Sequence, residues 1–100
     1  MYFIMDVITK DDLFYNDYSW TVYAKDNPKV TGEPDSTLLN RKEGYEILYF
    51  INKFCDINGL KSKSSATKVE KMIRNEVPGN IHSQLKIKEW IETNWKISQF

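Results

Sequence analysis

Hydrophobic and polar positions change their spacing along the chain, and this change divides it into two regions. Residues 2–9 and 13–25 are rich in aromatic and β-branched side chains, and the second run alternates in a way that is typical of strands. A polar break at 10–12 separates the two runs, and a turn at 26–28 ends the second. We therefore expect an antiparallel hairpin, or a small sheet, within residues 1–35.

Three later segments carry apolar residues at helical spacing. The first lies between Asn40, which forms a capping-box pattern with Glu43, and a stop signal at 58–59. The second begins at residue 64, 65 or 67, in the last case with Glu70 as box partner, and stops before 78. The third begins with Asn80 as its cap and runs to about residue 95. The apolar stripes contain Ile47, Leu48, Phe50, Ile51, Phe54 and Cys55, then Ala66, Val69, Met72 and Ile73, and then Ile87, Trp90, Ile91 and Trp95.

These patterns predict an α+β fold, in which an N-terminal hairpin or small sheet packs against three C-terminal helices. A chain of 100 residues is the usual size of one domain, so we expect a single domain over 1–100, with the hairpin region at 1–35 and the helices at 36–100. Gly44 faces the apolar side of the first helix, where a glycine costs about 1 kcal/mol of helix propensity. This position predicts that another backbone crosses closely there.

Composition and charge narrow the class of protein. No apolar run is long enough for a membrane helix, and the first residues lack the pattern of a signal peptide. A single cysteine cannot form an internal disulfide, so we expect a reducing, cytoplasmic location. The net charge is zero, but residues 1–40 carry seven acidic and three basic side chains, whereas residues 41–100 carry seven and eleven. The two halves can attract each other, or one can face a charged partner.

The side chains that usually carry catalysis are scarce. His82 follows the start of a helix, and Cys55 lies on an apolar stripe, where a thiol is usually buried and inert. The adjacent Asp11 and Asp12 are typical of a solvated turn more than of a cation site. No phosphate-binding glycine motif is present in the sequence. We therefore expect no enzyme activity, no cofactor and no metal.

A first candidate contact surface is formed by tyrosines. Tyr45 and Tyr49 lie four residues apart, on the side of the first helix opposite the core stripe. Tyrosine is enriched at protein interfaces, although the hairpin or the last residues of the chain provide another cover for these rings. The predicted partner-binding set is Tyr45, Tyr49, Asn52, Tyr15, Tyr18 and Tyr23.

A second candidate surface is basic. It contains Lys61, Lys63, Lys68, Lys71 and Arg74, which can contact either the phosphates of a nucleic acid or an acidic protein partner. Residues 61–90 also have the length of a helix-turn-helix, with His82, Gln84, Lys86 and Lys88 placed to read bases. Against nucleic-acid binding, Glu89 and Glu92 would repel phosphate, and the zero net charge gives no long-range attraction.

We predict a small, non-catalytic protein-binding module, present as a monomer or a homodimer and without a membrane segment. Its size and single-domain plan are typical of phage or mobile-element proteins that inhibit or adapt a host complex by occluding one of its proteins. The alternative is a nucleic-acid-binding module that uses the basic segment at 61–90.

Overall fold

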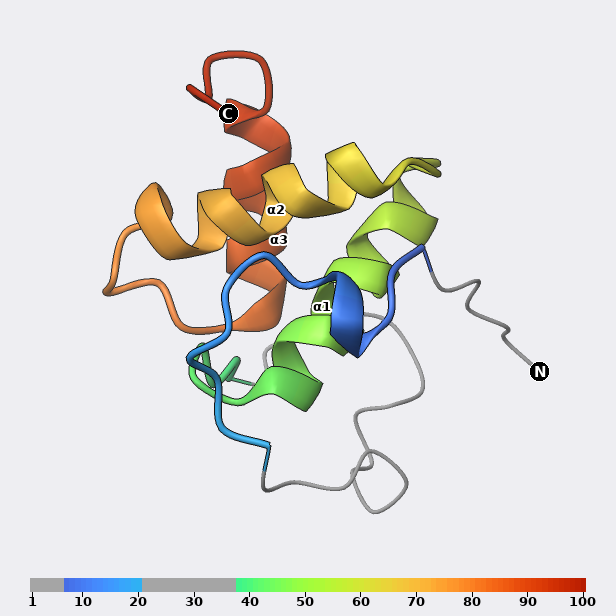
Figure 1. Ribbon diagram of the computed structural model, residues 1–100. Helices are drawn as coiled ribbons and strands as arrows, with labels where there is room; N and C mark the ends of the chain where they lie inside the picture. Colours follow the sequence, from blue (N-terminus) through green and yellow to red (C-terminus); the bar gives the residue numbers. More distant parts are fainter. Residues whose placement is uncertain (1–6, 21–37) are drawn as a thin grey trace, which may run out of the picture.

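The computed structural model describes residues 7–20 and 38–100, in which three α-helices are the main elements. The helices are α1 (Gly44–Ile57), α2 (Lys63–Asn75) and α3 (Gln84–Asn94), preceded by a short 3-10 turn, η1 (Lys10–Asp12). α2 packs against both α1 and α3, and residues 7–20, the N-terminal segment, run alongside it (Figure 1). None of the described helices is long and apolar enough to cross a membrane.

The predicted α+β class is wrong for the part of the chain that the structure describes, because it contains three helices and no strand. Ser19 makes an isolated bridge with Glu43, and Leu38 makes another with Ser83. Residues 2–6 of the first predicted strand and 21–25 of the second lie outside the described residues. Within 13–20, the amides of Phe14 and Tyr15 donate to a side chain of α2, and the amide of Ser19 donates to the Lys42 carbonyl at 2.8 Å in the isolated bridge. The aromatic residues within 13–20 therefore belong to a segment that packs on helices.

The helix ends differ from their predicted positions by up to one turn. Ser62 caps α2 by accepting a hydrogen bond from the Ser65 amide, and Ser83 caps α3 in the same way. The expected capping box at Asn40 is absent, since its side chain accepts from the Lys42 amide instead and α1 begins only at residue 44. The expected stop is confirmed, because α1 ends at residue 57 and Gly59 adopts a φ of 68°.

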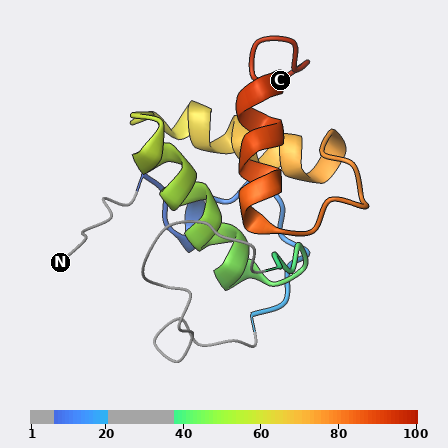
Figure 2. The ribbon, with the colours of Figure 1, turned by 180° about the vertical axis from the view of Figure 1, so that it is seen from behind.

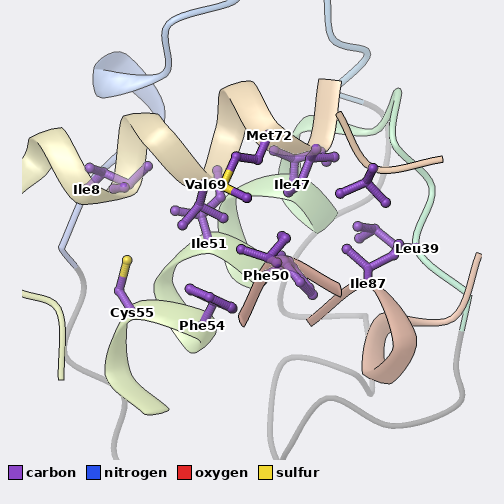
Figure 3. Packing of buried hydrophobic residues seen from close by; sticks show 14 residues of the cluster. Ile8, Leu39, Ile47, Phe50, Ile51, Phe54, Cys55, Val69, Met72 and Ile87 are labelled. Carbon is purple, nitrogen blue, oxygen red and sulfur yellow. The ribbon is translucent and has the colours of Figure 1, made fainter. Parts of the chain in front are cut away.

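The apolar stripes predicted from helical spacing meet in one core. Figure 3 shows side chains of α1 and α2 interleaved, with Ile8 at one end and Leu39 and Ile87 at the other. All of the α1 stripe except Leu48 is buried, as is the whole α2 stripe. Trp90 and Trp95 of the third predicted stripe are partly buried against this core. Helical periodicity therefore located most of the core, because packing of apolar faces stabilises short helices.

Gly44 marks a close crossing, as its position on the apolar face predicted. The amide of Gly44 donates to the carbonyl of Ser19 at 2.7 Å, which gives the first turn of α1 a partner for its backbone. The ring of Trp20 lies directly over the glycine, so that a Cβ added there would come within 2.5 Å of the indole. The N-terminal segment therefore crosses α1 at Gly44 with both the backbone of Ser19 and the side chain of Trp20.

Arg41 holds the connection between α2 and α3. Its guanidinium donates to the carbonyls of Val77 at 3.2 Å and Pro78 at 2.9 Å, and also to those of Ile73 and Ile81. Five donors in a planar fork suit such a set of carbonyls, which a lysine cannot reproduce. Partial burial lowers the pKa of Arg41 from its usual value. The connection at 76–83 is therefore held by hydrogen bonds from Arg41, a residue that lies before α1 and belongs to neither α2 nor α3.

Figure 2, seen from behind, shows α1 and α3 on this side, with α2 behind them. The opposite side of α2, which faces the viewer in Figure 1, lies between the N-terminal segment and the C-terminal turn. The core thus occupies one side of α2, and its other side forms an outer surface of the described fold.

Candidate functional site

The predicted tyrosine surface on α1 is partly covered by the N-terminal segment. The ring of Tyr45 meets Trp20 edge to face with 5.0 Å between centroids, and the ring of Tyr18 also meets Trp20 edge to face at 6.4 Å. The ammonium of Lys10 lies 4.4 Å from the centroid of Trp20. Tyr45 and Tyr49 both stay half-buried. The structure therefore joins Tyr45 and Tyr18 in one aromatic row that sequence spacing did not reveal.

The other members of the predicted set have internal roles or lie elsewhere. Asn52 is only 3% exposed, and its Oδ1 accepts from the amides of Val7 at 2.7 Å and Ile8 at 3.0 Å. Its Nδ2 donates to the Ile8 carbonyl at 3.0 Å. The Asn52 side chain thus forms the hydrogen bonds with the backbone of residues 7–8 that a neighbouring strand would form in a sheet. Tyr23 lies outside the described residues.

A buried carboxylate on α2 fastens the N-terminal segment, and the sequence analysis missed it. Glu70 is 1% exposed and accepts hydrogen bonds from the amides of Phe14 at 2.8 Å and Tyr15 at 3.1 Å. The hydroxyl of Tyr18 donates to the same carboxylate at 2.7 Å. Burial and the Glu70 carboxylate together raise the pKa of Tyr18 above its usual value. Glu70 is therefore not the capping-box partner that one reading of the second helix predicted.

Arg74 adds a second attachment beside this carboxylate. It forms a two-pronged ion pair with Asp17, with N–O distances of 2.9 and 2.7 Å, and this hydrogen bonding lowers the pKa of Asp17. The guanidinium carbon lies 4.1 Å from the centroid of Tyr15 and 5.3 Å from that of Tyr18. Asn75 also donates to the Tyr15 hydroxyl at 2.8 Å. Two tyrosines of the predicted contact set are therefore held against α2 within the monomer.

The outer side of α2 carries an open groove of about 530 Å³, here called the α2 groove. Its lining consists of Ser64, Thr67, Lys68, Lys71, Gln99 and Phe100. The four helical residues follow the spacing of one helix face, opposite the buried stripe, and the two last residues of the chain form a wall. The wall is held in place because the Glu76 carboxylate accepts from the Ser98 hydroxyl at 2.6 Å and from the Gln99 amide at 3.1 Å.

The two lysines of the α2 groove lie over aromatic rings. The ammonium of Lys68 is 4.3 Å from the centroid of Trp95, and that of Lys71 is 4.3 Å from Phe14 and 5.9 Å from Phe100. Phe14 and Phe100 are 59% and 43% exposed, among the most exposed large apolar side chains that the structure describes. An aromatic ring attracts an ammonium group without supplying a negative charge. Lys71 lies beside the two exposed rings, whereas Lys68 lies beside the partly buried Trp95.

The basic residues at the two ends of α2 are paired with acids, in contrast to those in its middle. Lys63 lies 3.2 Å from Asp12, and Arg74 pairs with Asp17 as described above. Among the described residues, Lys68 and Lys71 make no ion pair. Lys61 is exposed in the loop before α2. The predicted basic segment is therefore reduced to a short, charged centre between two nearly neutral ends.

The positions that a helix-turn-helix would use to read bases are not all accessible. Gln84 is buried, Lys88 forms an ion pair with Glu92 at 3.0 Å, and His82 and Lys86 are exposed. The connection between α2 and α3 also spans 76–83, longer than the short turn that the sequence predicted. These features do not favour α3 as a recognition helix.

The residues with catalytic potential are apart from the α2 groove. Cys55 is fully buried in the core, as predicted, and burial raises the pKa of its thiol to about 11. Within 7–20 and 38–100, no group of three histidine, cysteine or acidic side chains is arranged to hold a metal ion. A second open cleft of about 460 Å³ lies between the ends of α1 and α3, lined by Phe54, Asn58, Leu60, Glu92, Thr93, Trp95 and Lys96. On its rim, the Asn58 side-chain amide donates to the Glu92 carboxylate at 3.1 Å.

Comparison of the chain with protein-family models, with curated proteins and with solved structures finds no match.

Proposed function

We propose that this protein is a small, non-catalytic module that acts by binding another protein. The observation that carries the proposal is the outer side of α2, where the exposed rings of Phe14 and Phe100 flank the ammonium of Lys71 above an open groove. Aromatic side chains are enriched at the centres of protein interfaces, and two exposed rings on one face are the feature of this surface that favours binding. An inhibitor or adaptor that occludes a site on a larger complex is the most concrete form of this function.

The half-buried pair Tyr45 and Tyr49 is the second candidate contact surface for the same function. Tyrosine offers a large contact area with few rotatable bonds, which favours its use in recognition. Tyr45 also supports Trp20 within the monomer, so its removal affects folding as well as binding. Tyr49 lies one helical turn further along α1 and provides a second probe of this surface.

The experiment is quantitative capture of proteins from a lysate of the native host on the immobilised full chain. Wild type is compared with two folded variants, Phe14→Ser on the outer side of α2 and Tyr49→Ser on α1. We expect at least one protein that binds wild type and is lost from one variant, and the variant that loses it identifies the surface. If no protein is enriched on wild type over an unrelated domain of similar size, the proposed function is wrong.

A further inference from the structure

The α2 groove places two lysines and one aromatic ring, that of Phe100, within a short distance of each other. Ser64 and Lys71 are separated by seven helical rises, which is about 10 Å. An extended peptide advances about 3.3 Å per residue, so roughly three residues of a partner fit along this face. Ser64 and Thr67 also line the groove, together with Phe100.

The charges along α2 favour a negatively charged segment in the α2 groove. Lys68 and Lys71 present uncompensated positive charge at the centre, while Asp12 and Asp17 place carboxylates at the two ends, each beside its own cation. A carboxylate that approaches the centre gains charge-assisted hydrogen bonds from two ammonium groups. An anionic chain that continues past either end meets Asp12 or Asp17 and is repelled.

On these grounds we propose that the α2 groove binds a short acidic segment of a partner protein, with an aromatic or aliphatic side chain next to the acidic residues. The acidic side chains pair with Lys68 and Lys71, and the apolar side chain lies against the exposed rings of Phe14 and Phe100. This inference rests on the proposed function and adds to it the chemistry of the bound segment.

A nucleic-acid strand fits the same groove less well. One strand of DNA carries one negative charge per about 3.4 Å, so 10 Å of strand would bring roughly three phosphates to two lysines. The end cations, Lys63 and Arg74, are already paired with acids and cannot extend the contact without breaking those pairs. The zero net charge of the chain also gives no long-range attraction.

The test is a selection from a library of short random peptides on the full-length wild-type protein. A labelled synthetic copy of the most enriched peptide is then titrated by fluorescence anisotropy. We expect enriched sequences with two or three acidic residues beside an aromatic or aliphatic one. The double variant Lys68→Gln/Lys71→Gln weakens binding roughly tenfold, and salt weakens binding to wild type. The matched control, Lys86→Gln/Lys96→Gln, removes the same charge elsewhere on exposed positions and leaves affinity unchanged.

Folding is checked for each variant by far-ultraviolet circular dichroism. If the lysine double variant does not fold, Phe100→Ser removes an exposed ring and is expected to weaken binding several-fold without any change of charge. Enriched peptides that lack acidic residues, or that bind the double variant as well as wild type, overturn the inference. Binding of oligothymidine in place of acidic peptides, lost in the same double variant, also overturns it and assigns the groove to nucleic acid.

The outcomes separate this inference from the proposed function. If a host protein is captured but its binding is lost in Tyr49→Ser and retained in Lys68→Gln/Lys71→Gln, the protein-binding function stands and the α2 groove is not its site. If no acidic peptide is enriched, the chemistry assigned to the groove is wrong, and the capture experiment alone decides the function.

Discussion

Replacing Glu70 tests how the N-terminal segment is held on the helices. The carboxylate is buried and accepts three hydrogen bonds, two from the amides of Phe14 and Tyr15 and one from the hydroxyl of Tyr18. In Glu70→Ala all three donors lose their acceptor. Hydrogen bonds to a charged group contribute about 1.5–3 kcal/mol each, but part of this loss is recovered when residues 14–18 detach into water. We therefore expect the free energy of unfolding to fall by about 3–5 kcal/mol.

The conservative variant Glu70→Gln separates the number of hydrogen bonds from the volume of the side chain. Its amide oxygen can keep the two bonds at Oε2, from Tyr15 and Tyr18, while its NH₂ group faces the Phe14 amide and loses that bond. We expect a loss of about 1.5–3 kcal/mol for this variant. Glu70→Ala therefore destabilises the protein more than Glu70→Gln does.

The assay is urea unfolding followed by tryptophan fluorescence, with Glu89→Ala as a control at an exposed position. With a urea slope of about 2 kcal/mol/M, the midpoint of Glu70→Ala falls by roughly 2 M. Amide hydrogen exchange at residues 13–18 should accelerate first, because these amides lose their acceptor directly. A loss within about 1 kcal/mol of the Glu89→Ala value would refute this account of how the segment is attached.

Three further perturbations test other parts of the structure. Gly44→Ala puts a methyl group into the Trp20 ring and should cost about 1–3 kcal/mol in a thermal melt, whereas Gly79→Ala, with open space at its Cβ, should cost much less. Asn52→Ala removes three hydrogen bonds to residues 7–8 and should lower stability by about 2–4 kcal/mol in urea, and an unchanged midpoint would contradict its role. For Cys55, burial raises the native pKa to about 11 from a usual value near 9, so the unfolded state loses its proton first and stability should fall as pH rises through 9–11. The loss reaches about 2–3 kcal/mol, and a Cys55→Ala variant with the same pH dependence as wild type would contradict this assignment.

Some residues of the candidate site were predictable from the sequence, and others were not. The basic side chains of α2 and the tyrosines were found from spacing and residue type, but their partners in the N-terminal segment were not. One signal for Glu70 was present in the sequence. It lies four residues after Ala66 and three before Ile73, on the buried side of α2, and an acid at such a position must be hydrogen-bonded. Asn52 sits in the same way three residues before the buried Cys55.

The amino-acid sequence alone determined the three helices, the stop at Gly59 and most of the core, because these depend on helical periodicity and on local backbone preferences. It did not determine the state of residues 13–20. Alternating aromatic residues suit a strand and suit a segment lying across a helix equally well, since both present one side of the chain to a core. Only the tertiary structure decided between them, because the acceptors for the amides of Phe14 and Tyr15 are the carboxylate oxygens of Glu70, more than fifty residues away.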